Sequence, residues 1–198
     1  MNIDFARELL SLLISNKDQT GLGIIYIKLR SELPSQEIIQ SLEKVFKPFK
    51  VLWAVTRPGL AISPVHVLHV FYHTLKAFVT RDNISNKFNI EFLVRLTCED
   101  QITNALKIAG LDDRAREFCL YIISPNKDVL EESLSALSSL PVEVLLPLNV
   151  LKAPESGSLL KMLNVKSDEL STTSYKSSVL SAELKSVLTR MALLKIKR

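Results

Sequence analysis

The hydrophobic and polar positions along the chain follow two different periods, and each period predicts a different kind of element. Apolar residues three and four positions apart predict helices, whereas short β-branched runs bounded by Gly or Pro predict buried strands. The helical pattern covers residues 1–16, the segment that Ser35 opens, 64–79, 102–109 and 129–140. The strand pattern covers residues 21–30, 51–55, 90–97, 118–124 and 142–146. Strands that alternate with helices predict an α/β (α+β) fold in a single domain, with a small, mostly antiparallel or mixed sheet covered by helices.

The segment 64–79 is expected to be the central buried helix. Ser63 followed by Pro64 is typical of a helix start, and the apolar residues after them fall on one side at a spacing of 3.6 residues. His66, His69 and His73 share a face roughly opposite this apolar side. We expect this histidine face to be exposed or half-buried.

The segment 90–97 is expected to be a half-buried strand. Ile90, Phe92 and Val94 alternate there with Glu91 and Arg95. An alternation of apolar and polar residues is the period of a strand that has one face in the core.

The end of the chain, residues 178–196, carries a strong amphipathic helical pattern. Its apolar stripe consists of Leu180, Leu184, Val187, Leu188 and Met191. Such a stripe can pack on the chain's own sheet, or it can lie in a groove of a partner protein with Met in an adaptable position. The two can also hold together, one at each end of the helix.

Composition and charge narrow the class of protein. The chain has 198 residues, of which 47% are hydrophobic and 23% charged, so it can bury a core without disulfides or metal. The net charge is +4, and residues 161–198 carry 8 basic and 3 acidic residues. This tail can attract an acidic protein surface, a nucleic acid or an anionic membrane. Cys98 and Cys119 are expected to be thiols in the core.

Targeting patterns and catalytic motifs are not found in the sequence. No apolar run approaches the ~20 residues of a membrane span, and the first residues do not resemble a signal peptide, so we expect a cytoplasmic protein without a membrane partner. The phosphate-binding, hydrolase and metalloprotease motifs are also missing. We therefore expect no enzyme, no catalytic residue, no cofactor and no metal.

The histidine face leaves two alternatives open. A metal-dependent enzyme would use His66, His69 and His73, but seven residues of helix rise ~10.5 Å, which is too far for one ion to bridge all three rings. An RNA-binding module would stack His66 and His73 on unpaired bases. Lys76, Arg81 and Lys87, which follow on the same helix and its exit loop, would then reach phosphates.

Several short blocks of this sequence form a pattern in their order and spacing. The blocks are Ser63 to Ala77, EFLVRLT (Glu91 to Thr97), QITNALKIAG (Gln101 to Gly110), CLYII (Cys119 to Ile123) and SVLTRM (Ser186 to Met191). Together they resemble the CGI/TPRKB family, the kinase-binding accessory subunit of the KEOPS complex. The resemblance covers roughly residues 24–196. It divides the chain into an N-terminal helical extension, 1–20, and an accessory-subunit-like domain, 21–198, in which 178–196 is the partner-binding helix.

The resemblance implies a non-catalytic subunit in a complex that installs threonylcarbamoyl on the adenosine (t6A) next to the anticodon of tRNA. It implies that the C-terminal helix docks on the KEOPS kinase subunit, and that other KEOPS subunits are reached indirectly. The docking role falls on Leu184, Val187, Leu188 and Met191, so deleting residues 179–198 is expected to abolish kinase binding and leave the fold intact.

The resemblance also implies contact with tRNA, in particular its 3′ end. That contact maps to the region of His66, Lys76 and Arg81. The sequence departs from archaeal relatives at Glu99 and Asp100, where those relatives often carry a basic residue. Carboxylates repel phosphate, which argues against an RNA role for this loop.

Overall fold

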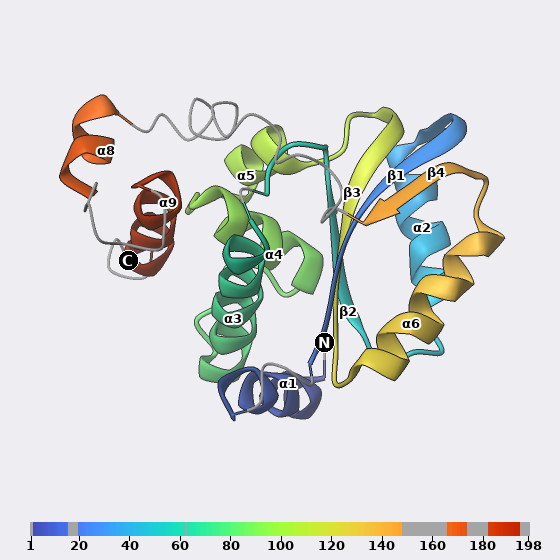
Figure 1. Ribbon diagram of the computed structural model, residues 1–198, viewed down its shortest axis with the longest axis horizontal. Helices are drawn as coiled ribbons and strands as arrows, with labels where there is room; N and C mark the ends of the chain where they lie inside the picture. The colour runs from blue at the N-terminus through green and yellow to red at the C-terminus, as the bar shows by residue number, and fades with distance from the viewer. Residues whose placement is uncertain (1, 16–19, 62, 148–165, 174–181, 195–198) are drawn as a thin grey trace.

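A four-stranded antiparallel sheet lies between two layers of helices (Figure 1). The computed structural model describes residues 2–15, 20–61, 63–147, 166–173 and 182–194. The strand order across the sheet is β2 (Leu52–Thr56), β3 (Arg114–Ser124), β1 (Gly21–Pro34) and β4 (Val142–Pro147). The predicted mixed α/β fold with a small sheet covered by helices is confirmed.

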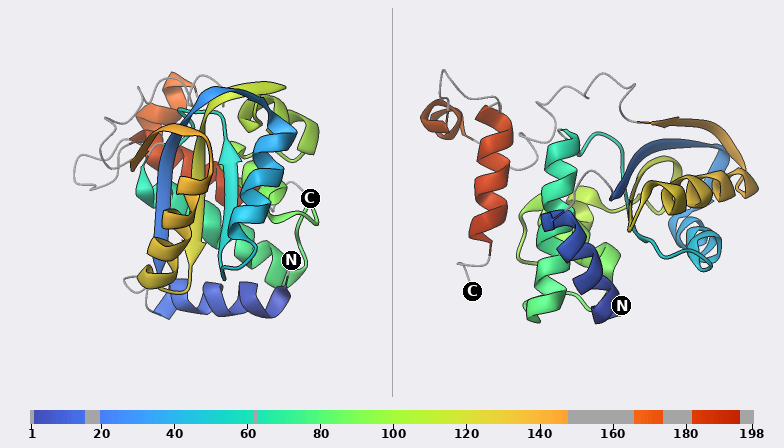
Figure 2. Two further views of the ribbon diagram at one scale, coloured as in Figure 1. Left: turned by 90° about the vertical axis from the view of Figure 1, so that its right-hand side faces the viewer. Right: turned by 60° about the horizontal axis from the view of Figure 1, so that its bottom comes forward.

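The helices form layers on both faces of this sheet and beyond it. One face carries α3 (Pro64–Thr80), α4 (Phe88–Thr97) and α5 (Ile102–Ala109), and α1 (Ile3–Ser15) packs on α3 (Figure 1). The other face carries α2 (Ser35–Phe46), α6 (Lys127–Ser135) and the 3₁₀ turn η1 (Ala136–Ser139). Two further helices, α8 (Ser167–Thr173) and α9 (Ala182–Leu193), form an outer layer, with α9 against α3 and α4 (Figure 2).

Successive side chains along a strand point to opposite faces of the sheet, so the sheet has a separate core on each face. Phe71 of α3, Phe92 of α4 and Tyr121 of β3 are fully buried on one side, and the rings of Phe71 and Phe92 lie 4.8 Å apart. Ile27 and Leu120 point to the other side, into the core beneath α2 and α6. Removal of this apolar surface from water is the main force that holds the layers together.

The prediction of a strand over residues 90–97 is wrong, because this segment is the helix α4. Every residue from Glu91 to Thr97 is buried, since α4 has neighbours on several sides: the sheet, α3, α5 and α9. A helix that is buried on nearly all sides has no broad polar face, so local alternation of apolar and polar residues can make its sequence resemble a strand. The apparent alternation contains Glu91 and Arg95, which are spaced i, i+4 and pair with each other inside the protein.

Other predicted elements match the structure closely. Ser63 caps α3 by accepting a hydrogen bond from the backbone N–H of His66 at 3.2 Å, and Pro64 is the first helical residue. The predicted helix over 129–140 is divided into α6 and the 3₁₀ turn η1.

The N-terminal helix and the cysteines contribute to the core. In α1, Ala6 and Leu9 are fully buried. Cys98 and Cys119 are free thiols, half-buried and buried respectively, as predicted. Among the described residues, no helix combines the length and the apolar character that crossing a bilayer requires.

Candidate functional site

The apolar stripe of α9 faces the protein's own core. Leu184, Val187 and Met191 are 5%, 0% and 1% exposed, and Val187 and Met191 belong to the same core as α3 and α4. The prediction that these three side chains face a partner is therefore wrong, and Leu180 lies outside the described residues. The physical reason is that α3 packs on α1 and α4 and also on α9, so the apolar stripe of α9 is needed within the monomer to cover α3. Deleting the helix would remove part of the core instead of leaving the fold intact.

The opposite side of α9 is open to solvent. We call it the outer face, and it consists of Lys185, Leu188, Thr189, Ala192 and Leu193. Lys185 and Leu188 are half-buried, with Leu188 at the edge of the outer face and packed against the core, and Leu193 is 44% exposed. The outer face thus has apolar side chains at its edges and a lysine between them. Of the residues expected to bind the kinase, Leu188 alone belongs to it.

A polar clasp joins α8 to α9. The carboxylate of Glu169 accepts hydrogen bonds from Arg190 Nε at 2.9 Å and from Arg190 Nη2 at 2.6 Å, and also from the hydroxyl of Ser186. The hydrogen bonds from Arg190 hold the pKa of Glu169 below its usual value, and those same bonds raise the pKa of Arg190. Sequence reasoning missed this clasp, because 17 and 21 residues separate Glu169 from its two partners.

A pocket of about 180 Å³ opens where α3, α4 and α9 meet. Its polar lining comes from His73, Lys76, Thr80, Asp82 and Arg95. Its apolar lining comes from Ala77, Ile84, Met191, Ala192 and Leu194. His73 and Lys76, which were expected to bind RNA, therefore line the same pocket as Met191, which was expected to bind the kinase.

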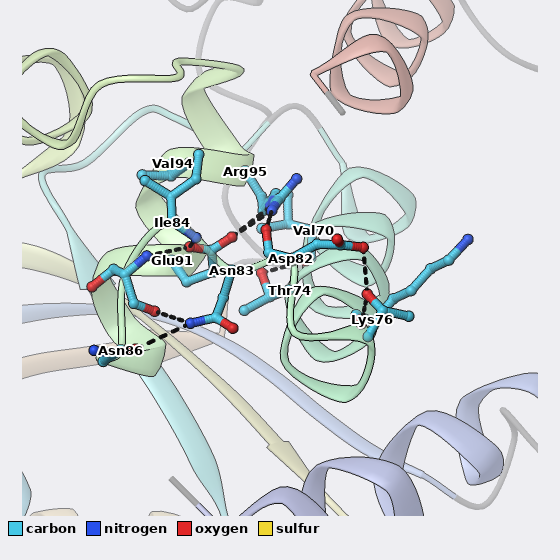
Figure 3. Close-up of polar contacts among 12 residues, drawn as sticks. Val70, Thr74, Lys76, Asp82, Asn83, Ile84, Asn86, Glu91, Val94 and Arg95 are labelled. Atoms are coloured by element: carbon cyan, nitrogen blue, oxygen red, sulfur yellow. Dashed lines mark hydrogen bonds and ion pairs between the residues drawn. The ribbon is translucent and has the colours of Figure 1, made fainter. Parts of the chain in front are cut away.

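A buried ion pair supports one wall of this pocket (Figure 3). Glu91 Oε1 accepts a hydrogen bond from Arg95 Nε at 2.9 Å, and Glu91 Oε2 accepts from the backbone N–H groups of Ile84 and Ser85 at 2.7 and 2.8 Å. Arg95 also reaches the carbonyl oxygen of Asp82 at 3.4 Å. The pair thus fastens the loop between α3 and α4 onto α4. The i, i+4 spacing of Glu91 and Arg95 is the pattern that could have revealed the pair.

The three histidines occupy different environments. His66 has no exposed surface, and burial first, then the neighbouring His69, lowers its pKa to about 4. His69 and His73 are half-buried, and their rings lie 6.4 Å apart. The expectation of an exposed or half-buried face is wrong for His66, because it lies on the buried side of α3 with Val67 and Val70, and its ring cannot stack on a base. No group of three potential metal ligands occurs among the residues that the structure describes.

The basic residues expected to bind RNA are at the surface. Lys76, Arg81 and Lys87 are exposed, and Lys76 Nζ lies 5.7 Å from the centre of the Tyr72 ring. Arg81 ends α3 in the left-handed conformation, with φ of 60°, and Lys87 precedes α4. Burial first, and then nearby positive groups, lower the pKa of His73 to about 4, so its ring is neutral at pH 7.

Comparison with known proteins adds no relative to these observations. The chain matches no protein-family model, and a search of curated proteins finds no match for it.

Proposed function

We propose that this chain is a non-catalytic accessory subunit of the KEOPS complex, which binds the kinase subunit through α9 and helps to recruit tRNA for t6A modification. One observation carries the proposal. The blocks that resemble the CGI/TPRKB family are separate in the sequence, and the last of them lies far from the other four, yet they fold into α3, α4, α5, β3 and α9, which share one core. A common core for these blocks is what a shared ancestral fold requires.

The kinase-binding surface in this proposal is the outer face of α9. The buried stripe holds the helix against α3 and α4, so the helix presents its other side as a rigid element. Leu193 supplies the main apolar contact there, the part of Leu188 that the core leaves open adds to it, and Lys185 supplies a positive charge. A rigid helix with apolar and charged positions can bind a groove with little loss of conformational entropy.

The tRNA-binding surface in this proposal is the exposed basic side of α3 and the loop that follows it. Lys76, Arg81 and Lys87 carry positive charge into solvent, where phosphate contacts form readily. His73 and Lys76 also line the pocket, which offers an apolar wall beside polar groups to an unpaired nucleotide. His66 has no part in this surface.

The chemistry in this proposal belongs to other subunits, and the chain acts in the cytoplasm.

A stand-alone RNA-binding module is the second candidate, because the exposed lysines and arginine do not depend on a kinase. That candidate predicts tRNA binding without any affinity for the kinase.

The test is a calorimetric titration of the KEOPS kinase subunit into the full-length chain and its variants. Leu193→Asp, which places a charge on the outer face, is expected to weaken kinase binding at least tenfold. Leu106→Asp is the matched control, because Leu106 of α5 is 40% exposed, close to the 44% of Leu193. Absence of binding by the unmodified chain, or equal effects of the two substitutions, would overturn the proposed docking.

A further inference from the structure

The two outer helices are held to the protein by different forces. α9 buries apolar side chains, such as Val187 and Met191, against α3 and α4. None of the described side chains of α8 is buried, and only Glu169 and Leu170 are half-buried. α8 packs on α9 at the edge of the molecule (Figures 1 and 2). Removing α8 would therefore expose little apolar surface, whereas removing α9 would open the core.

The clasp lies beside the outer face of α9. At about 100° per residue, Ser186 and Arg190 fall between the buried stripe and Leu193, which is three residues from Arg190 and seven residues, about two turns, from Ser186. Arg190 is half-buried, with 31% of its side chain exposed. α8 thus covers the flank of α9 that borders the surface assigned to the kinase.

Glu169 shows which chemistry this flank accepts. Two nitrogens of the guanidinium and one hydroxyl converge on a single carboxylate. Paired donation from a guanidinium is the geometry by which arginine recognises carboxylates. A carboxylate of another protein could take the same position without leaving Arg190 unpaired, since one acceptor would replace another.

We infer that α8 is a displaceable cover, and that Ser186 and Arg190 beneath it form an anchor for an Asp or Glu side chain of the partner that docks on α9. This inference rests on the proposed function, which supplies the partner. In the free chain Glu169 fills the anchor, and docking exchanges it for the partner's carboxylate. The contact of α8 with α9 is then autoinhibitory, because the partner has to displace Glu169 before it binds fully.

The test compares two substitutions that break the same ion pair from opposite sides. Kinase affinity is measured by calorimetry for Glu169→Ala, Arg190→Ala and the control Asp168→Ala, which removes an exposed carboxylate of α8 from outside the clasp. Glu169→Ala is expected to tighten binding roughly threefold to tenfold because the competitor is removed, and Arg190→Ala to weaken it about tenfold. Asp168→Ala is expected to leave affinity unchanged.

If the clasp only stabilised the structure, Glu169→Ala and Arg190→Ala would both weaken kinase binding to a similar extent. That result would overturn the inference and leave the proposed function standing. Absence of kinase binding by the unmodified chain would overturn the proposed function, and this inference with it. Hydrogen exchange supplies a second measurement on the free chain: Glu169→Ala is expected to speed exchange in α8 and not in α9, and faster exchange in both helices would contradict a separable cover.

Discussion

Glu91 and Arg95 form a buried ion pair within one turn of α4, and neither side chain has more than 7% of its surface exposed. The remaining carboxylate oxygen accepts two backbone N–H groups of the loop between α3 and α4. The pair therefore connects α4 to the loop that bounds the pocket. Among the residues that the structure describes, Glu91 and Arg95 are the only Asp, Glu, Lys or Arg residues that are buried.

Replacing Glu91 by Ala should destabilise the fold by about 3–5 kcal/mol, because it leaves the Arg95 charge buried without its partner and two N–H groups without their acceptor. Urea unfolding followed by circular dichroism measures this loss. Glu131→Ala on the exposed side of α6 is the control and should change stability by less than ~0.5 kcal/mol. A loss below about 1 kcal/mol for Glu91→Ala would mean that the pair does not fasten the loop.

The buried His66 should make stability depend on pH. Burial holds its pKa at about 4 in the folded chain, against about 6.5 when unfolded, so the unfolded chain binds the extra proton first. Stability is therefore complete above pH 6.5 and falls as the pH drops towards 4, by about 3 kcal/mol at most for this group.

Unfolding experiments between pH 4 and pH 7 measure this dependence. His66→Gln should flatten the slope, and His69→Gln, at a half-buried position, should flatten it less. Equal slopes for the unmodified chain and His66→Gln would show that His66 is protonated in the folded state as well.

Removing α9 should damage the fold. Deletion of residues 182–198 uncovers the apolar side of α3 and α4, and Met191→Ala alone should cost about 2–5 kcal/mol because Met191 is 1% exposed. Thermal melting and binding of a hydrophobic dye measure both effects. A deletion variant that melts as cooperatively, and at the same temperature, as the full chain would contradict the packing of α9.

The basic surface of α3 should bind tRNA mainly through phosphates. Substituting Lys76 and Arg81 by Ala should weaken binding and lower the log-log salt slope by ~1 to 2 units, because fewer counterions are released. Filter binding at several salt concentrations measures the slope. Lys44 and Lys47 are exposed at the end of α2, across the sheet from α3, so replacing them by Ala should leave the slope unchanged. Equal effects of the two double substitutions would indicate binding without a defined surface.

The sequence predicted elements well where local chemistry decides them. The start of α3 at Ser63 and Pro64 and the strands around Ile27 and Leu120 follow from capping and from β-branched runs. It failed for α4, because a helix buried on nearly all sides has no broad polar face that would distinguish it from a strand. The sequence also failed to predict which surface the apolar stripe of α9 packs against. The pattern shows that Val187 and Met191 are apolar, but it does not show whether the same chain or a partner covers them.

The candidate site, too, could be predicted from the sequence only where local spacing decides it. Exposed basic residues such as Lys76 could be named from helical spacing. The clasp between Glu169 and Arg190 could not, since it depends on how two separate helices approach each other.

Reconstituted t6A synthesis tests the central claim most directly. The remaining KEOPS subunits are assayed for threonylcarbamoyl transfer to tRNA with and without this chain, and the chain is also assayed alone. The account predicts that the chain accelerates the reaction of the other subunits, that Leu193→Asp loses most of this acceleration, and that the chain alone forms no product. An unchanged rate on adding the chain, or product formed by the chain alone, would contradict a non-catalytic accessory role.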